Sequence, residues 1–298
     1  MAKRKDKRND LIWTAVKGFQ HIVNVLPHSV AVHFGAFVGL CVWALSKRKV
    51  DEAEKRCVDV LGVGVTNARK IVKGSYVNLG RSLSEFLRLP KLREKLFNYV
   101  TVHGEENLKE AFSKGRGVIL LTAHLGNWEL AAAYLGLSGY PMNAIGAEQR
   151  DEKITDLVEL LRASCNVKTI GKGFDLKSAL SCLKRGELLG VLLDQDFRDK
   201  GIVVPFLGVD ASTPYGPLKM ADKLGSIIVP LFIIRRPDGL RHDLFFLEPL
   251  KPKSGDSFGE ALLESTALCN EVISQWILKS PEQWMWLYDR WASTRESG

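Results

Sequence analysis

The chain has 298 residues, of which 46% are hydrophobic and 26% are charged, so it can bury a sizeable core and is neither disordered nor wholly embedded in a membrane. Its formal net charge of +8 favours acidic partners (phospholipid headgroups, nucleic acid or an acidic carrier protein), and composition does not choose among them. The five cysteines are scattered and form no CxxC pair, which is typical of reduced thiols on the cytoplasmic side of a membrane.

The first fifty residues combine basic charge with apolar stretches. A basic opening over residues 3–8 precedes an amphipathic stretch that Pro27 ends, and no cleavage site of the signal-peptide type follows. The next 18 residues, Ser29–Ser46, contain no Asp, Glu, Lys or Arg; as a helix they would span roughly 27 Å, slightly less than the ~30 Å hydrocarbon core of a bilayer. Because Lys47–Lys49 make the second flank basic as well, we expect a monotopic or dipping membrane element. A buried helix of a soluble fold is the alternative.

Residues 51–98 carry helical signals without strand signals, because apolar side chains recur every three or four residues and Pro90 ends the pattern. From Tyr99 onward, strands and helices alternate, which is typical of a sheet covered by helices. Strands are predicted at Tyr99–His103, Val118–Ala123, Met142–Ala147, Leu188–Leu193, Ile202–Pro205, Ile227–Ile234 and Asp243–Leu247. Helices are predicted at Glu106–Ser113, Trp128–Leu137, Glu152–Ala163, Leu176–Lys184, Pro217–Leu224, Glu260–Ile277 and Pro281–Trp291.

The residues with the clearest chemical potential lie between a predicted strand and a predicted helix. The apolar run GVILLTA leads into His124, followed by Gly126 and the helix-starting Asn127. The carboxyl end of a strand is where α/β folds place their ligand sites. With His124 in the turn and Glu129 in the first helical turn, the carboxylate can accept the Nδ1 proton and leave Nε2 as a base.

Residues 122–129 by themselves also fit a structural histidine that ends a strand. Other chemistries find no support, because the sequence has no GxSxG elbow, P-loop, GxGxxG or HExxH motif and no clustered metal ligands. We therefore expect neither a metal nor a cofactor. Nucleic-acid binding is not expected either, because the basic residues form no patch interleaved with aromatic side chains.

Several further segments match the motifs of one family in the same order along the chain. They are HLGNWE at 124–129, EQRD at 148–151 leading to Arg162, LLDQD at 192–196, VPFLG at 204–208 with Thr213, Gly216 and Ala221, RPDG at 236–239, and PEQWMWL at 281–287. The set covers roughly residues 20–292 and resembles the lipid A biosynthesis (lauroyl/myristoyl) acyltransferase family. That family lies within the wider glycerolipid acyltransferase superfamily, whose mark is HxxxxD/E.

The resemblance implies an α/β fold with a glycerolipid-acyltransferase-like mixed sheet flanked by helices. Residues 1–50 would form basic and apolar membrane-associating helices, 51–98 a helical segment packing on the catalytic domain, and 99–298 the α/β acyltransferase domain. It also implies an inner-membrane enzyme that faces the cytoplasm and transfers a fatty acyl group to a hydroxyl of a phosphorylated glycolipid. The donor would be an acyl thioester on acyl carrier protein or coenzyme A, and the partners would be that carrier protein, the acceptor lipid and the membrane surface.

The resemblance also implies roles for single residues. His124 would be the general base and Glu129 its partner, in a ternary-complex mechanism in which the acceptor hydroxyl attacks the thioester directly. Substrate binding is predicted for Asn127, Arg150, Arg162, Asp194 and Gln195. Arg150 would bind phosphate or stabilise charge at the reacting carbonyl, and Asp194 and Gln195 should lie near the same crevice because they follow an apolar strand.

Simpler interpretations stay open for these residues: solvated arginines on a helix for Arg150 and Arg162, and a turn after a strand for Asp194 and Gln195. Two alternative functions also remain. One is acyl transfer to another acceptor, such as a mannosylated inositol lipid, a lysophospholipid or another glycolipid; Glu152 stands where the family often has Asn, which leaves the acceptor open. The other is a non-catalytic lipid-binding protein.

Overall fold

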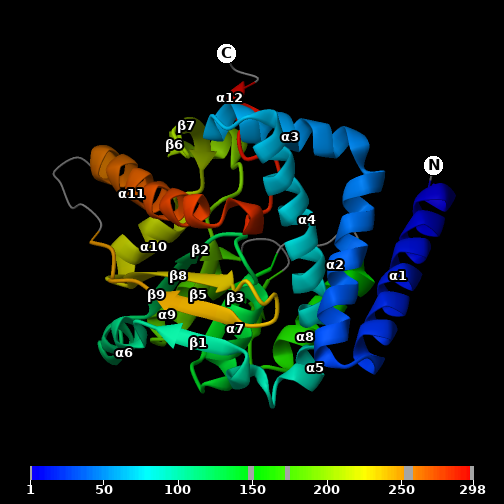
Figure 1. Cartoon of the computed structure of the whole chain (residues 1–298). Helices are drawn as coiled ribbons and strands as arrows, with labels where there is room; N and C mark the ends of the chain where they lie inside the picture. The colour runs from blue at the N-terminus through cyan, green and yellow to red at the C-terminus, as the bar shows by residue number, and fades with distance from the viewer. Residues whose placement is uncertain (1, 147–150, 172–174, 252–257, 296–298) are drawn as a thin grey trace.

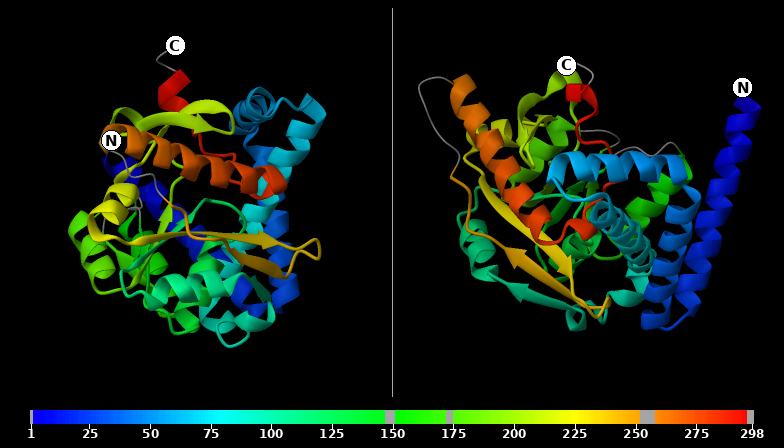
Figure 2. Two further views of the ribbon diagram at one scale, coloured as in Figure 1. Left: turned by 90° about the vertical axis from the view of Figure 1, so that its left-hand side faces the viewer. Right: turned by 45° about the horizontal axis from the view of Figure 1, so that its top comes forward.

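The computed structural model describes residues 2–146, 151–171, 175–251 and 258–295. Helices form the N-terminal third of the chain, and the remainder builds a sheet covered by helices (Figure 1). The N-terminal elements are α1 (Ala2–Val25), α2 (His28–Leu45), α3 (Lys47–Leu61), α4 (Val65–Leu87), α5 (Leu89–Leu92) and the 3₁₀ turn η1 (Leu96–Asn98). Pro27 separates α1 from α2, as its position in the sequence predicts. In Figure 1 and in the right view of Figure 2, α1 lies at the outer edge of the molecule, beside α2.

α2 is the described helix that is long and apolar enough to cross a membrane, and 22% of its 18-residue window is buried. It packs against α4 through glycines that let the two backbones approach closely. A Cβ on Gly80 would lie 2.2 Å from the carbonyl oxygen of Gly35, and one on Gly39 would lie 2.3 Å from the carbonyl oxygen of Tyr76. One side of α2 is thus fixed to α4, and the rest of the described chain does not enclose the helix.

The main sheet has seven strands in the order β1-β9-β8-β2-β5-β3-β4. The strands are β1 (Val100–His103), β2 (Val118–Thr122), β3 (Met142–Ile145), β4 (Lys168–Ile170), β5 (Leu188–Leu192), β8 (Ile227–Arg235) and β9 (His242–Phe246). Within the run β8-β2-β5-β3-β4, each strand is parallel to the next. β9 runs antiparallel to β8 and pairs in parallel with β1. The predicted α/β class with a mixed sheet flanked by helices is therefore confirmed.

Helices cover both faces of this sheet. They are α6 (Glu105–Ser113), α7 (Trp128–Leu137), α8 (Glu152–Ala163), α9 (Leu176–Lys184), α10 (Gly216–Leu224) and α11 (Phe258–Lys279). Side chains alternate along β2: Ile119 and Leu121 pack with α9, α10 and α11, whereas Val118 and Leu120 pack with α6, α7 and α8. Because both faces are covered, all five residues of β2 are buried.

The predicted helix at Pro281–Trp291 is wrong. The chain forms a 3₁₀ turn, η3 (Pro281–Gln283), then runs without regular structure to the short helix α12 (Ala292–Arg295). Residues two apart on an α-helix point about 200° apart, but Trp284 and Trp286 are both buried in the same core cluster. The irregular path brings the two indoles into contact, with ring centroids 4.7 Å apart.

Two strands were not predicted from the sequence. One is β4, and the other is β7 (Val209–Thr213), which forms an antiparallel hairpin with β6 (Ile202–Phe206). Figure 1 shows this hairpin near α12 at the top, away from the main sheet. Both missed strands are short and partly polar, so their strand conformation depends on pairing partners rather than on local propensity.

Candidate active site

His124 and Asp194 meet because two parallel strands end side by side. The register of β2 and β5 pairs Thr122 with Leu192. His124 and Asp194, two positions after these residues, therefore leave the sheet as neighbours. The Nδ1 atom of His124 lies 2.8 Å from Asp194 Oδ1, and the backbone N–H of His124 donates to Oδ2 at 2.9 Å. The imidazole also packs against the Trp128 ring in an edge-to-face arrangement, with ring centroids 4.8 Å apart.

Asp194 has a third donor that the sequence did not indicate. The indole Nε1–H of Trp284 donates to Asp194 Oδ2 at 2.8 Å, and both residues are buried. Burial alone would raise the pKa of Asp194, but the charge of His124 and the hydrogen bonds from His124 and Trp284 outweigh it and lower the pKa. An ionised Asp194 requires the proton of the neutral imidazole to sit on Nδ1, which leaves the Nε2 lone pair as a base.

The predicted contact between His124 and Glu129 is corrected by the structure. Glu129 lies in the first turn of α7 and points to α8, where Arg162 donates to it from Nε at 2.9 Å and from Nη2 at 2.7 Å. Arg162 is 7% exposed, and its pKa is raised because the charge and hydrogen bonds of Glu129 outweigh burial. The partner of His124 Nδ1 is therefore Asp194, and not Glu129 as the sequence spacing predicted. The ion pair of Glu129 and Arg162 instead joins α7 to α8.

Asn127 is buried, and both ends of its amide are used within the protein. Its Oδ1 accepts the backbone N–H of Leu130 at 3.3 Å, which caps α7 as the sequence predicts, and its Nδ2 donates to Glu85 at 2.8 Å. The preceding Gly126 has φ +64°, and a Cβ there would lie 1.7 Å from the carbonyl oxygen of Ile233. This turn therefore tolerates only glycine.

Two further predicted residues are Arg150 and Gln195. Arg150 is outside the described residues. Gln195 is exposed beside the buried Asp194. Substrate binding by Asn127, Arg150, Arg162 and Gln195 stays a prediction. The sequence missed Trp284 and Glu85; the tryptophan lies in the PEQWMWL segment, so its motif was noticed, but no spacing linked it to Asp194.

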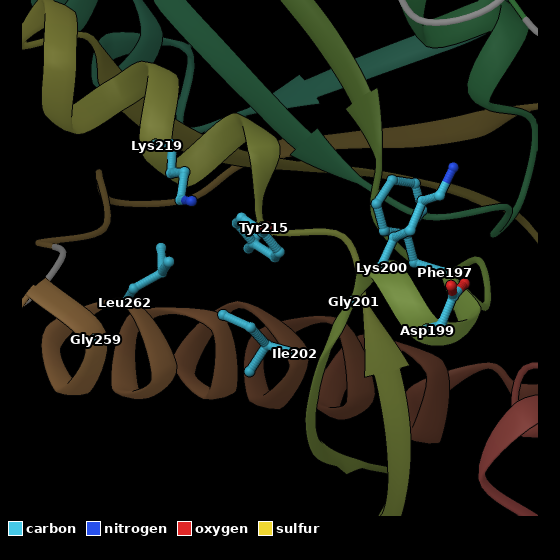
Figure 3. A pocket seen from close by; sticks show the side chains of 9 residues that line it. All are labelled: Phe197, Asp199, Lys200, Gly201, Ile202, Tyr215, Lys219, Gly259 and Leu262. Carbon is cyan, nitrogen blue, oxygen red and sulfur yellow. The ribbon is translucent and has the colours of Figure 1, made fainter.

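An open pocket of about 700 Å³ lies between residues 197–202, which lead into β6, and the first turns of α10 and α11 (Figure 3). Apolar side chains of Phe197, Ile202 and Leu262 line it together with Tyr215 and Lys219, whose ammonium lies 4.4 Å from the Tyr215 ring centroid. Of the predicted site residues that the structure describes, none lines this pocket.

Comparison with known proteins places the chain in a family. A sequence model described as bacterial lipid A biosynthesis acyltransferase matches residues 2–293. The chain belongs to this family. It is therefore an acyltransferase related to lipid A biosynthesis, and the match extends over the N-terminal helices as well as the α/β part.

Proteins similar to this chain differ in the lipid that their names mention. The lipid A biosynthesis lauroyltransferase of Escherichia coli (strain K12) is 27% identical and covers 97% of this chain and 93% of its own length. The phosphatidylinositol mannoside acyltransferase of Mycolicibacterium smegmatis is 22% identical, covering 74% of this chain and 72% of its own. The solved 1-acyl-sn-glycerophosphate acyltransferase of Thermotoga maritima covers 80% of this chain and 96% of its own at 15% identity, and its TM-score of 0.38 is too low to bear on the fold.

The pair of Glu129 and Arg162 can be tested through stability. Glu129→Gln removes the carboxylate that accepts two hydrogen bonds from the buried Arg162, so we expect the free energy of unfolding to fall by about 3–5 kcal/mol. Adding Arg162→Met should recover most of the loss, and chemical denaturation of the three proteins measures both effects. A Glu129→Gln variant as stable as the wild type would show that the two side chains are not paired.

Proposed function

We propose that this protein transfers a fatty acyl group from an acyl thioester to a hydroxyl of a phosphorylated glycolipid, with His124 as general base and Asp194 as its partner. The observation that carries the proposal is the hydrogen bond of 2.8 Å between His124 Nδ1 and the buried Asp194 carboxylate. It lies at the carboxyl end of parallel strands, where α/β proteins bind their ligands.

In the proposed reaction, Nε2 of His124 takes the proton of the acceptor hydroxyl while its oxygen attacks the thioester carbonyl. The carbon–sulfur bond then breaks, and the thiolate leaves with the proton returned by the imidazolium, so the base is regenerated. Asp194 stabilises the imidazolium formed between these steps. The first N–H groups of α7 have no partner within the helix, and the helix N-terminus stabilises the negative charge on the tetrahedral oxygen.

A lipid A precursor is the acceptor we propose, because the family and the Escherichia coli lauroyltransferase act in lipid A biosynthesis by name. The alternative is a mannosylated inositol lipid, which the name of the Mycolicibacterium smegmatis relative supports. Acyl carrier protein is the proposed donor, and its acidic character suits a chain of net charge +8. Neither a metal nor a cofactor takes part in the proposed steps.

The proposed location is the cytoplasmic face of the inner membrane. The side of α2 away from α4 leaves large apolar side chains in solvent: Val30 is 47% exposed, Phe37 59% and Leu45 86%. Apolar surface of this kind on a helix beside basic segments is typical of a membrane-binding element. An acceptor lipid stays in its bilayer, so binding along α2 would hold the His124 centre near the headgroups.

The partner of His124 can be tested by kinetics. Asp194→Asn should lower kcat by about 10²–10⁴-fold, because an amide turns an N–H toward at least one of the donors that surround Asp194. His124→Ala should lose as much, and the double variant should be little worse than either because the two act as a unit. Transfer from acyl–acyl carrier protein is measured separately with a lipid A precursor and with a phosphatidylinositol mannoside.

The control for this comparison is Asp199→Asn, which makes the same chemical change at an exposed position five residues further along. It should leave kcat within about twofold of the wild type. If Asp194→Asn were equally harmless, Asp194 would not be the partner of His124. A fully active His124→Ala would remove the proposed mechanism altogether.

Membrane binding can be tested through α2. Replacing Val30, Phe37 and Leu45 together by Gln removes exposed apolar surface without opening the core, so we expect the protein to move from the membrane pellet to the supernatant with little change in melting temperature. The control makes the same change to Gln at Val203 and Leu263, which are 52% and 48% exposed on β6 and α11. This control protein should stay in the pellet. Wild-type protein found in the supernatant without detergent or salt would contradict the proposal.

A further inference from the structure

We infer that Glu85, on α4 and outside all the motifs of the α/β part, is a positioning residue that orients the turn carrying His124. The inference rests on the proposed function of that centre. Glu85 has no exposed surface, and one of its oxygens contacts the turn directly, because Asn127 Nδ2 donates to Oε2 at 2.8 Å. The helical N-terminal region thus supplies a residue that acts on the site through Asn127.

Arg235, at the end of β8, fixes Glu85 in place. Its Nη1 donates to Glu85 Oε1 at 2.9 Å and its Nη2 to Oε2 at 2.7 Å. Burial alone would raise the pKa of Glu85, but the charge and hydrogen bonds of Arg235 outweigh burial and lower the pKa. A two-pronged contact of this kind fixes orientation as well as distance.

The same arginine extends the network along α4. It donates from Nε to Asn78 Oδ1 at 2.9 Å and from Nη2 to Ser82 Oγ at 3.2 Å. In turn, Asn78 Nδ2 and Ser82 Oγ donate to the carbonyl oxygen of Gly126 at 3.1 and 3.2 Å. Asn78, Ser82 and Glu85 share one face of α4 because they are spaced by four and three residues.

The C-terminal segment holds the opposite side of the same turn. The N–H of Gly126 donates to the carbonyl oxygen of Gln283 at 3.1 Å, and the N–H of Met285 donates to the carbonyl oxygen of His124 at 3.1 Å. The Gln283 side chain bonds both the N–H and the carbonyl of Arg235, at 2.8 and 2.9 Å. The turn is therefore held between α4 and the segment after α11.

These contacts have a chemical consequence beyond stability. The Asn127 side chain caps the start of α7, so its direction sets where the first N–H groups of that helix point. The backbone of Gly126 sets the angle at which His124 leaves β2. A misplacement of about 1 Å in such groups can cost on the order of 100-fold in rate. A loss of Glu85 should therefore appear in kcat rather than in the KM for either substrate.

Two variants test the inference. Glu85→Gln removes the charge that holds Arg235, and Asn127→Ser keeps a good helix cap but is too short to reach Glu85. Both should lower kcat by about 10- to 100-fold and leave both KM values within about twofold. The matched control is Ser84→Ala, which removes a hydrogen bond of 2.8 Å from the same helix to the carbonyl oxygen of Ala31 on α2 and should keep kcat.

The outcomes separate this inference from the proposed function. If transfer depends on His124 while Asn127→Ser, as a folded protein, keeps wild-type kcat, Glu85 does not position the turn and the inference is overturned. The same holds if Ser84→Ala lowers kcat as much as Asn127→Ser, because general loosening of α4 would then explain both. If His124→Ala transfers acyl groups at the wild-type rate, the proposed function falls and the inference falls with it.

Discussion

Asp194 is a buried carboxylate that accepts three hydrogen bonds, two from His124 and one from Trp284. An ionised group can stay buried only if donors and opposite charge replace the water it loses. That requirement couples three distant parts of the chain: β2 must end beside β5, and the segment after α11 must bring an indole to the same point. Trp284 meets this requirement from the irregular segment that follows η3.

A second buried carboxylate imposes a similar requirement from the N-terminal side. Glu85 and Arg235 satisfy one another and, through Asn127 and Gly126, fix the turn between β2 and α7. The turn that carries His124 therefore lies between the N-terminal helix α4 and the C-terminal segment around Gln283 and Met285. The family match runs from residue 2 to residue 293 and so includes α4, which contacts the turn that carries His124. α4 also packs against the apolar helix α2. The helix that contacts the turn of His124 therefore also holds the helix that we propose binds the membrane.

Much of this arrangement followed from the sequence, and the exceptions have physical causes. Buried parallel strands and amphipathic helices have strong local patterns, so α7, α8 and α9 begin and end where periodicity predicts. Asp194 lies beside His124, as expected for a residue that directly follows an apolar strand. Spacing misassigned Glu129, because five residues along one chain say nothing about Arg162, which approaches from α8. Glu85 and Trp284 escaped notice because their contacts join residues far apart in sequence, which no local pattern records.

The hydrogen bond between His124 and Asp194 can be observed directly by nuclear magnetic resonance of protein labelled with ¹⁵N at histidine. We expect a strongly downfield proton attached to Nδ1 of His124, with Nε2 unprotonated in the neutral ring. This signal should disappear in Asp194→Asn and His124→Ala and persist in a folded Glu129→Gln protein. A signal that survives Asp194→Asn but is lost in Glu129→Gln would show that Glu129 is the partner of His124, and the proposed centre would be wrong.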